Sequence, residues 1–215
     1  MKKFAIILSG SGVYDGSEIH EATMIMLAIT QHDCTYYCFA PDIKQHHVIN
    51  HFTKEVTPET RNVLVESARI ARGMIKPLTS FDANDFDAIL FPGGSGAIKN
   101  LSNYEYKGEN CEVIPQIKKV IIDMHNLNKP IGAMCISPVI IAKVLDNTTI
   151  TIGNDEFTAK KISDMGATHV NTSYGEVIAD KKNKIFTTPC YMLDSTIADI
   201  YDGSSNLIKS ILENI

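Results

Sequence analysis

The stretch Lys129–Leu145, KPIGAMCISPVIIAKVL, decides the expected fold because it joins a short apolar run to a helical pattern through one cysteine. The apolar run, Ile131–Met134, has the length and character of a buried strand. The helical pattern begins near Pro138, and proline is accepted in the first turn of a helix because no intrahelical donor is required there. Cys135 therefore lies between a strand and a helix, which predicts a sharp turn at that residue.

The same alternation of apolar runs and helical patterns continues through the chain, which is typical of an α/β fold with a mostly parallel sheet. We predict strands at Ala5–Leu8, Thr35–Ala40, Ala88–Phe91 and Ile131–Met134. We predict helices at Glu18–Gln31, Arg61–Arg72, Val113–Asn126, Pro138–Leu145 and Ser195–Leu212. The segments Glu176–Ala179 and Lys184–Thr187 flank a polar turn and predict a β-hairpin near the C-terminus. A length of 215 residues fits one domain over residues 1–215.

Composition narrows the classes of partner. The chain has 20 Lys and Arg against 25 Asp and Glu, with no block of like charges, so we expect neither nucleic acid nor a membrane as partner. The apolar run at Phe4–Leu8 is too short for a signal sequence, and no apolar stretch has the length of a membrane span. Five cysteines without a CxxC pair indicate reduced thiols, and we expect a cytoplasmic location.

The predicted turn at Cys135 suggests a reactive thiol. In parallel sheets ligands bind beyond the carboxyl ends of the strands, and the free amides of a following helix favour an anion there. We therefore expect a lowered pKa and a nucleophilic thiolate at Cys135, with a positive φ angle at the turn. The alternative is that Cys135 is a small buried apolar residue, as free cysteines commonly are.

Two glycines follow another predicted strand at the same edge of the sheet. Gly93 and Gly94 carry no side chains that would obstruct a substrate, and their amides could hold an oxyanion. The alternative is a tight turn that needs glycine geometry.

Four segments together resemble one known family. They are SGVYDGSEIHEA, ILFPGGSGAIKNLS, GAMCISP and TTPCYML, and the similarity extends over essentially the whole chain. The chain resembles the ElbB family, the enhancing-lycopene-biosynthesis or sigma cross-reacting proteins, within the ThiJ/PfpI and class I glutamine amidotransferase-like superfamily. The resemblance implies a flavodoxin-like three-layer sandwich, a homodimer, a nucleophile elbow at Cys135 and an acid at Glu18 that reaches the sulfur. Some members are described as cofactor-independent glyoxalases acting on glyoxal, so we expect no cofactor and no metal.

Glu18 also has a structural interpretation. Asp15 could cap the helix with Glu18 closing a capping box three residues later. The two interpretations are compatible, because a helix that starts at the carboxyl end of a strand delivers its first turn to the same crevice. A carboxyl close to a thiolate should have a raised pKa and could carry a proton.

Some superfamily features are missing from the sequence. Many ThiJ/PfpI proteins have a histidine immediately after the nucleophile, where this chain has Ile136, and Thr149–Asp155 lacks the late histidine and glutamate of amidotransferases. A complete Cys-His-acid triad is therefore not expected. We interpret His20 as a solvated helix residue and assign no role to Cys190.

The main functional hypothesis is a glyoxalase that converts a small 2-oxoaldehyde to a 2-hydroxy acid. Cys135 would add to the aldehyde, Glu18 would move the proton, and the amides of Gly93, Gly94 and Ile136 would hold the oxyanion. The alternative is a redox-sensing or binding protein in which Cys135 is oxidised. An amidase or amidotransferase subunit is a third hypothesis, but it needs a histidine that the sequence does not supply.

Overall fold

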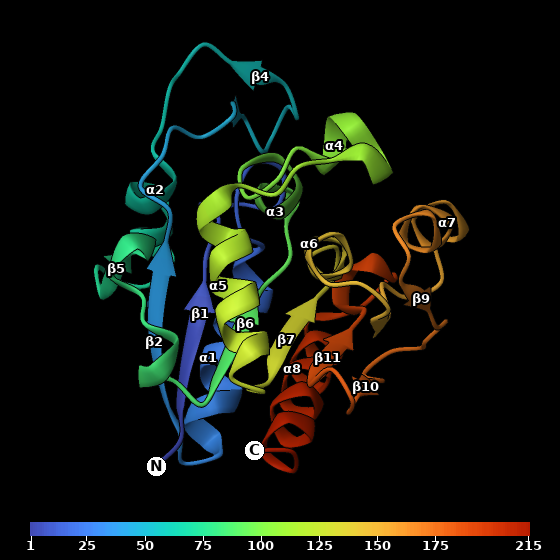
Figure 1. The fold of residues 1–215 in the computed structure, drawn as a ribbon. Helices are drawn as coiled ribbons and strands as arrows, with labels where there is room; N and C mark the ends of the chain where they lie inside the picture. Colours follow the sequence, from blue (N-terminus) through green and yellow to red (C-terminus); the bar gives the residue numbers. More distant parts are fainter.

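The computed structural model describes residues 1–215 and contains a seven-stranded sheet in the order β10-β11-β7-β6-β1-β2-β5 (Figure 1). Its strands are β1 (Lys3–Ile7), β2 (Thr35–Ala40), β5 (Ile75–Pro77), β6 (Ala88–Phe91), β7 (Ile131–Met134), β10 (Ile178–Asp180) and β11 (Ile185–Thr188). All neighbouring pairs are parallel except β10 with β11, which form the antiparallel hairpin. The mostly parallel sheet and the C-terminal hairpin are confirmed.

Helices cover both faces of this sheet. They are α1 (Ile19–Gln31), α2 (Val63–Ile70), α3 (Ser95–Lys99), α4 (Tyr104–Lys107), α5 (Pro115–Asn126), α6 (Pro138–Val144), α7 (Glu156–Asp164) and α8 (Ile197–Leu212). One apolar cluster joins the sheet to α5 and α6, and a second joins it to α1 and α8. The flavodoxin-like three-layer sandwich is therefore confirmed.

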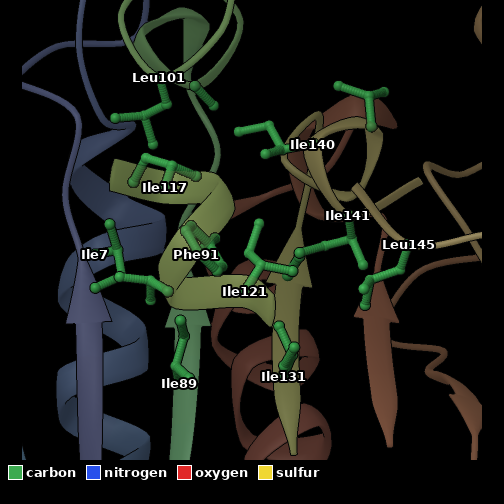
Figure 2. Packing of buried hydrophobic residues seen from close by; sticks show 14 of the residues in the cluster. Ile7, Ile89, Phe91, Leu101, Ile117, Ile121, Ile131, Ile140, Ile141 and Leu145 are labelled. Carbon is green, nitrogen blue, oxygen red and sulfur yellow. The ribbon is translucent and has the colours of Figure 1, made fainter. Parts of the chain in front are cut away.

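Residues alternate between the two clusters along each central strand, as strand geometry requires. In β6, Ile89 and Phe91 belong to the cluster under α5, whereas Leu90 belongs to the cluster under α1 and α8. Figure 2 shows the first cluster, in which Ile117 and Ile121 of α5 lie over these strand residues. Both faces of the strands are apolar because both faces are covered by helices.

The strand order places three chain segments together at one edge of the sheet. Strands β7, β6 and β1 are neighbours and point the same way, with Phe91 opposite Ala133 in the register of β6 and β7. Their carboxyl ends therefore meet, which confirms the arrangement predicted for the strands that end near Ser9, Phe91 and Met134. Figure 1 shows the arrows of β1, β6, β7 and β11 rising toward this common edge.

Several short elements were not predicted from the sequence. They are the ribbon of β3 (Val48–Ile49) with β4 (Val56–Thr57), the pair of β8 (Thr149–Ile150) with β9 (Thr168–His169), edge strand β5, and helices α3, α4 and α7. Strands of two or three residues are too short to show periodicity. Helix α7 had a detectable signal, because Asp155 caps it by accepting a hydrogen bond from the Thr158 amide. No helix combines the length and the apolar character needed to cross a membrane.

Candidate active site

Cys135 occupies a strained turn between β7 and α6. Its φ angle is 59°, in the left-handed region that costs a non-glycine residue about 1–3 kcal/mol. The Cys135 amide donates to the carbonyl of Thr188 at 3.0 Å, which extends the β7–β11 pairing by one residue. The Ser137 hydroxyl holds the other side of the turn by donating to the carbonyl of Pro92 at 2.6 Å. The predicted elbow is confirmed, and Cys135 is buried, with 7% of its surface exposed.

The carboxyl beside the sulfur belongs to Glu21, in the first turn of α1. This side chain is fully buried and forms a hydrogen bond with Cys135. Its Oε2 accepts from the Gly93 amide at 2.9 Å, and its Oε1 accepts from the Tyr191 amide at 3.3 Å. A Cβ atom on Gly93 would lie 2.8 Å from the sulfur and 2.6 Å from Glu21 Oε2. Glycine at position 93 therefore lets the thiol and the carboxyl meet.

The expectation that Glu18 provides the carboxyl at the sulfur is corrected by this geometry. Glu18 is the N-cap of α1, and its Oε2 accepts from the Glu21 amide at 2.7 Å. A carboxylate that caps a helix must fold back on the first-turn amides, whereas Glu21 faces the sheet. The capping box at Asp15 is also wrong, since the Asp15 carboxylate accepts from the Ile49 amide instead.

Helical periodicity could have identified Glu21. It lies four and seven residues before Ile25 and Ala28, on the buried stripe of α1. A carboxyl on an otherwise apolar stripe requires a specific partner, because burial of an unpaired charge is costly.

Both acidic groups of the site have raised pKa values. Burial, and after it the like charge of Glu18, raises the pKa of Glu21 to about 8. Hydrogen bonds from the Tyr191 amide, Cys135 and the Gly93 amide lower this pKa but do not offset the burial. Burial, and after it the Glu21 charge, raises the pKa of the Cys135 thiol, whereas hydrogen bonds from the amides of Gly94 and Ile136 lower it by less. The lowered pKa predicted for Cys135 is therefore wrong, because desolvation outweighs the helix N-terminus.

The two groups titrate as a pair, because each charge disfavours the other. Glu21 keeps its proton at neutral pH, and the pair loses its first proton as the pH rises through about 8. The first proton leaves Glu21, because its pKa of about 8 lies below that of the Cys135 thiol, which is raised well above its ordinary value of 9.0. The amides of Gly94 and Ile136 lower the pKa of the thiol and so stabilise the reverse state, in which the charge lies on the sulfur. The site can thus hold a thiolate beside a carboxylic acid.

The backbone amides at this edge divide into two groups. The Gly93 amide is occupied by Glu21, so the oxyanion role predicted for it is not open in this arrangement. The Gly94 and Ile136 amides face the sulfur. Gly94 has a φ angle of 94°, and a Cβ there would lie 2.4 Å from the Glu18 amide nitrogen, so the turn also needs glycine for its geometry.

Residues at the end of β11 complete the site, and sequence reasoning had given them no role. Cys190 has a φ angle of 43° and is buried, and its pKa is raised by burial and then by the charges of Glu21 and Cys135. The hydroxyl of Tyr191 forms a hydrogen bond with His20 Nδ1 at 2.8 Å. His20 is therefore tied to the site, although its ring is exposed as expected. The available signal was the TTPCYML segment itself.

No group of three or more His, Cys, Asp or Glu side chains is placed to hold a metal ion. The polar groups around Cys135 are the Glu21 carboxyl, the Cys190 thiol and backbone amides, and amides of this kind suit an organic substrate with a carbonyl oxygen.

Cys135 is a strained cysteine between a parallel strand and a helix. At the same edge of the sheet, the segments that follow neighbouring strands supply a carboxyl and backbone amides. This combination defines the class I glutamine amidotransferase-like proteins of the ThiJ/PfpI type. The chain is 41% identical to the mitochondrial ES1 protein homolog of Rattus norvegicus, covering 98% of this chain and 83% of the relative. It is also 41% identical to the mitochondrial glutamine amidotransferase-like class 1 domain-containing protein 3 of Homo sapiens, covering 98% and 82%. The chain belongs to this ES1/ElbB family. No protein-family model matches the chain.

Solved structures agree with this assignment. An isoprenoid biosynthesis protein with an amidotransferase-like domain from Ehrlichia chaffeensis superposes with a TM-score of 0.92 at 36% identity, covering 99% of this chain and 100% of that one. Glyoxalase III from Candida albicans superposes with a TM-score of 0.63 at 12% identity, covering 100% and 97%. The second likeness shows the fold alone.

The cytoplasmic location predicted from the sequence is contradicted. Both the rat and the human relatives carry the word mitochondrial in their names. The expectation of reduced thiols, drawn from five cysteines without a CxxC pair, does not by itself say which reducing compartment holds the protein.

Proposed function

We propose that the protein is a cofactor-independent glyoxalase that converts a small 2-oxoaldehyde, such as glyoxal or methylglyoxal, to a 2-hydroxy acid. The observation that carries the proposal is the contact between the strained Cys135 thiol and the protonated, buried Glu21 carboxyl. One group is suited to add to a carbonyl carbon, and the other to give and take protons. The fold shared with the Candida glyoxalase III is compatible with this chemistry.

The reaction begins when the Cys135 thiolate adds to the aldehyde carbon, C1, while Glu21 protonates the resulting alkoxide. This step forms a carbon–sulfur bond and leaves a hemithioacetal beside the Glu21 carboxylate. The carboxylate then removes the hydrogen from C1 to give an enediolate, and the C1 hydroxyl proton moves to the oxygen on C2. Return of the proton from Glu21 to C2 produces a thioester of a 2-hydroxy acid.

Water completes the cycle. It adds its hydroxyl to C1 and its proton to Glu21, and the carbon–sulfur bond breaks to restore the thiolate. C1 is oxidised and C2 is reduced within one molecule, so no external oxidant or reductant is needed. The amides of Gly94 and Ile136 stabilise the charge on the sulfur and are the candidates for holding the oxygen charge that develops next to it. Glu18 acts on Glu21 through its charge and its capping bond.

Turnover of glyoxal to glycolate by the purified chain tests the proposal. We expect Cys135→Ser to lose at least about two orders of magnitude in kcat/KM, because the nucleophile is removed. Cys34→Ser is a matched control, since Cys34 is a free thiol outside the site and should leave turnover unchanged. A Cys135→Ser protein that works at the wild-type rate would refute the mechanism.

Cys190 favours a second candidate function, redox sensing. It is a second buried thiol at the end of the strand next to β7, and its charge is coupled to that of Cys135. A hydroperoxide would oxidise Cys135 to a sulfenic acid and be reduced to an alcohol or water, and condensation with Cys190 would release water and form a disulfide. Intact mass after mild peroxide treatment, compared with glyoxal turnover, distinguishes the functions: oxidation of Cys135 without turnover supports the sensor.

From the same resemblance we also propose that the protein forms a homodimer, with a small aldehyde as its substrate. Light scattering at micromolar concentration gives the mass and would show a monomer if this proposal is wrong.

A further inference from the structure

The turn after β11 is tied to the start of α1 at two adjacent residues. The Tyr191 amide donates to Glu21 Oε1 at 3.3 Å, and the Tyr191 hydroxyl is hydrogen-bonded to His20 Nδ1 at 2.8 Å. The two rings also pack, with centroids 5.9 Å apart. One residue of the turn thus holds the buried carboxyl through its backbone and the neighbouring helix residue through its side chain.

We propose that His20 and Tyr191 are positioning residues, and that their surface hydrogen bond keeps the Tyr191 amide on the Glu21 carboxyl. Neither residue needs to touch a substrate in this role. The catalytic consequence rests on the proposed function, whereas the effect on Cys135 reactivity does not.

The inner bond depends on the outer one because Tyr191 makes both hydrogen bonds that attach the turn to α1. The rest of the turn is anchored elsewhere, through the buried Cys190, whose carbonyl accepts from the Ser195 hydroxyl at 2.9 Å. Residues 189–193 form a tight turn in which Met192 donates to the Pro189 carbonyl at 3.0 Å and Leu193 to the Cys190 carbonyl at 3.1 Å. These bonds lie within the turn and do not attach it to α1. The amide bond to Glu21 is already long at 3.3 Å, so loss of the hydroxyl bond should let the turn move away and weaken it further.

Displacement of this amide has a predictable electrostatic effect. The titratable groups that face Glu21 are Glu18 on α1, Cys135 at the elbow, and Cys190 with Tyr191 after β11, and the Gly93 amide bonds the same carboxyl. The hydrogen bond from the Tyr191 amide lowers the pKa of Glu21. Its loss should therefore raise the pH at which Glu21 ionises, and over that range the Cys135 thiol should ionise more easily because the Glu21 charge that raises its pKa is absent.

Three variants test this inference. Tyr191→Phe and His20→Ala each remove the outer bond, whereas His20→Asn retains a polar atom near the position of Nδ1. The measurement is the rate of Cys135 alkylation by iodoacetamide as a function of pH, followed on the Cys135 peptide by mass spectrometry so that the other cysteines do not interfere. This readout needs no substrate turnover, and His20 is exposed, so its variants should fold.

We expect Tyr191→Phe and His20→Ala to move the alkylation profile to lower pH and to raise the rate about twofold near pH 8.5, because less of the Glu21 charge then opposes ionisation of the thiol, with His20→Asn close to wild type. The double variant should move the profile no further than either single variant. Unchanged profiles would overturn the inference, and so would a loss of rate that is equal at every pH. If the profiles shift but the wild-type chain does not turn over glyoxal, the positioning role stands and the proposed function fails.

Discussion

Replacement of Glu21 by Gln should change how the stability of the protein depends on pH. The Glu21 carboxyl is fully buried, and its pKa rises from an ordinary value of 4.5 to about 8. Below pH 4.5 the group is protonated in both the folded and the unfolded chain. Between these two values only the folded chain keeps the proton, so exposure of the carboxyl to water favours unfolding increasingly as the pH rises.

The sign and the size of the effect follow from linkage. A carboxyl whose pKa is raised by folding contributes stability that is fully present below pH 4.5 and is lost as the pH rises toward about 8. Between about pH 5.5 and 8.5 the loss is on the order of 3 kcal/mol of unfolding free energy. Gln has no proton to lose, so Glu21→Gln should not show this part of the dependence.

Urea unfolding of wild type and Glu21→Gln at several pH values from about 5.5 to 8.5 measures the difference directly, provided that the transitions are two-state. The Gln amide must face either the Gly93 or the Tyr191 amide with a donor, which adds a destabilisation that does not vary with pH. The diagnostic quantity is therefore how the difference in unfolding free energy between wild type and Glu21→Gln changes with pH. Glu55→Gln, at an exposed carboxyl, is the control. A difference between wild type and Glu21→Gln that stays constant across this range would refute the protonated, buried carboxyl.

Three other perturbations follow from the same geometry. Glu18→Gln removes a like charge that raises the pKa of Glu21, so Glu21 should ionise at lower pH and its charge should move the pH profile of Cys135 alkylation to higher pH, whereas a profile that moves to lower pH would contradict this. Weaker capping in the same variant should lower the unfolding free energy by roughly 1 kcal/mol. Gly93→Ala would place a methyl group 2.3 Å from the Cys135 Cβ, so thermal unfolding should show a loss of about 1–3 kcal/mol and glyoxal turnover should fall, whereas unchanged behaviour would mean that the elbow can relax. Wild-type kcat/KM for glyoxal should rise with pH through about 8 as the pair loses its first proton, and a profile that falls over this range would argue against thiolate attack.

The elbow could be predicted from the sequence because its determinants are local. A buried strand, one cysteine and a proline at the first helical position follow one another within the segment Ile131–Pro138, and each has a direct conformational consequence. The parallel arrangement of the strands then follows from the alternation of element types. These features need no knowledge of distant contacts.

The partner of the cysteine could not be chosen by the same means. Glu18 and Glu21 both lie in the first turn of a predicted helix, and the choice between them depends on where the helix begins and which side faces the sheet. The motif Asp15 to Glu18 favoured a capping box one turn too early. The buried stripe shared with Ile25 and Ala28 was the stronger signal, because it reports on the face that packs against the strands.

The direction of the Cys135 pKa shift depends on burial, which one local segment does not reveal. Burial comes from packing by α1, the Gly93–Gly94 turn and the end of β11, three segments that are distant in the sequence. Because the desolvation of a buried charge exceeds the effect of a helix N-terminus, the isolated thiol is a poorer acid than the elbow alone suggests.

A thiol with a raised pKa is still compatible with nucleophilic chemistry, because the relevant quantity is the ionisation of the thiol–carboxyl pair. After the pair loses one proton, the remaining proton lies mainly on the sulfur, because Glu21 is the more acidic group, and the amides of Gly94 and Ile136 make the reverse state, a thiolate beside a carboxylic acid, accessible. Near pH 7 a minority of molecules then hold a thiolate beside a carboxylic acid, the state in which attack and protonation can occur together. A less acidic thiol is also intrinsically more nucleophilic once ionised, so a pair that ionises near pH 8 balances the fraction of thiolate against its reactivity.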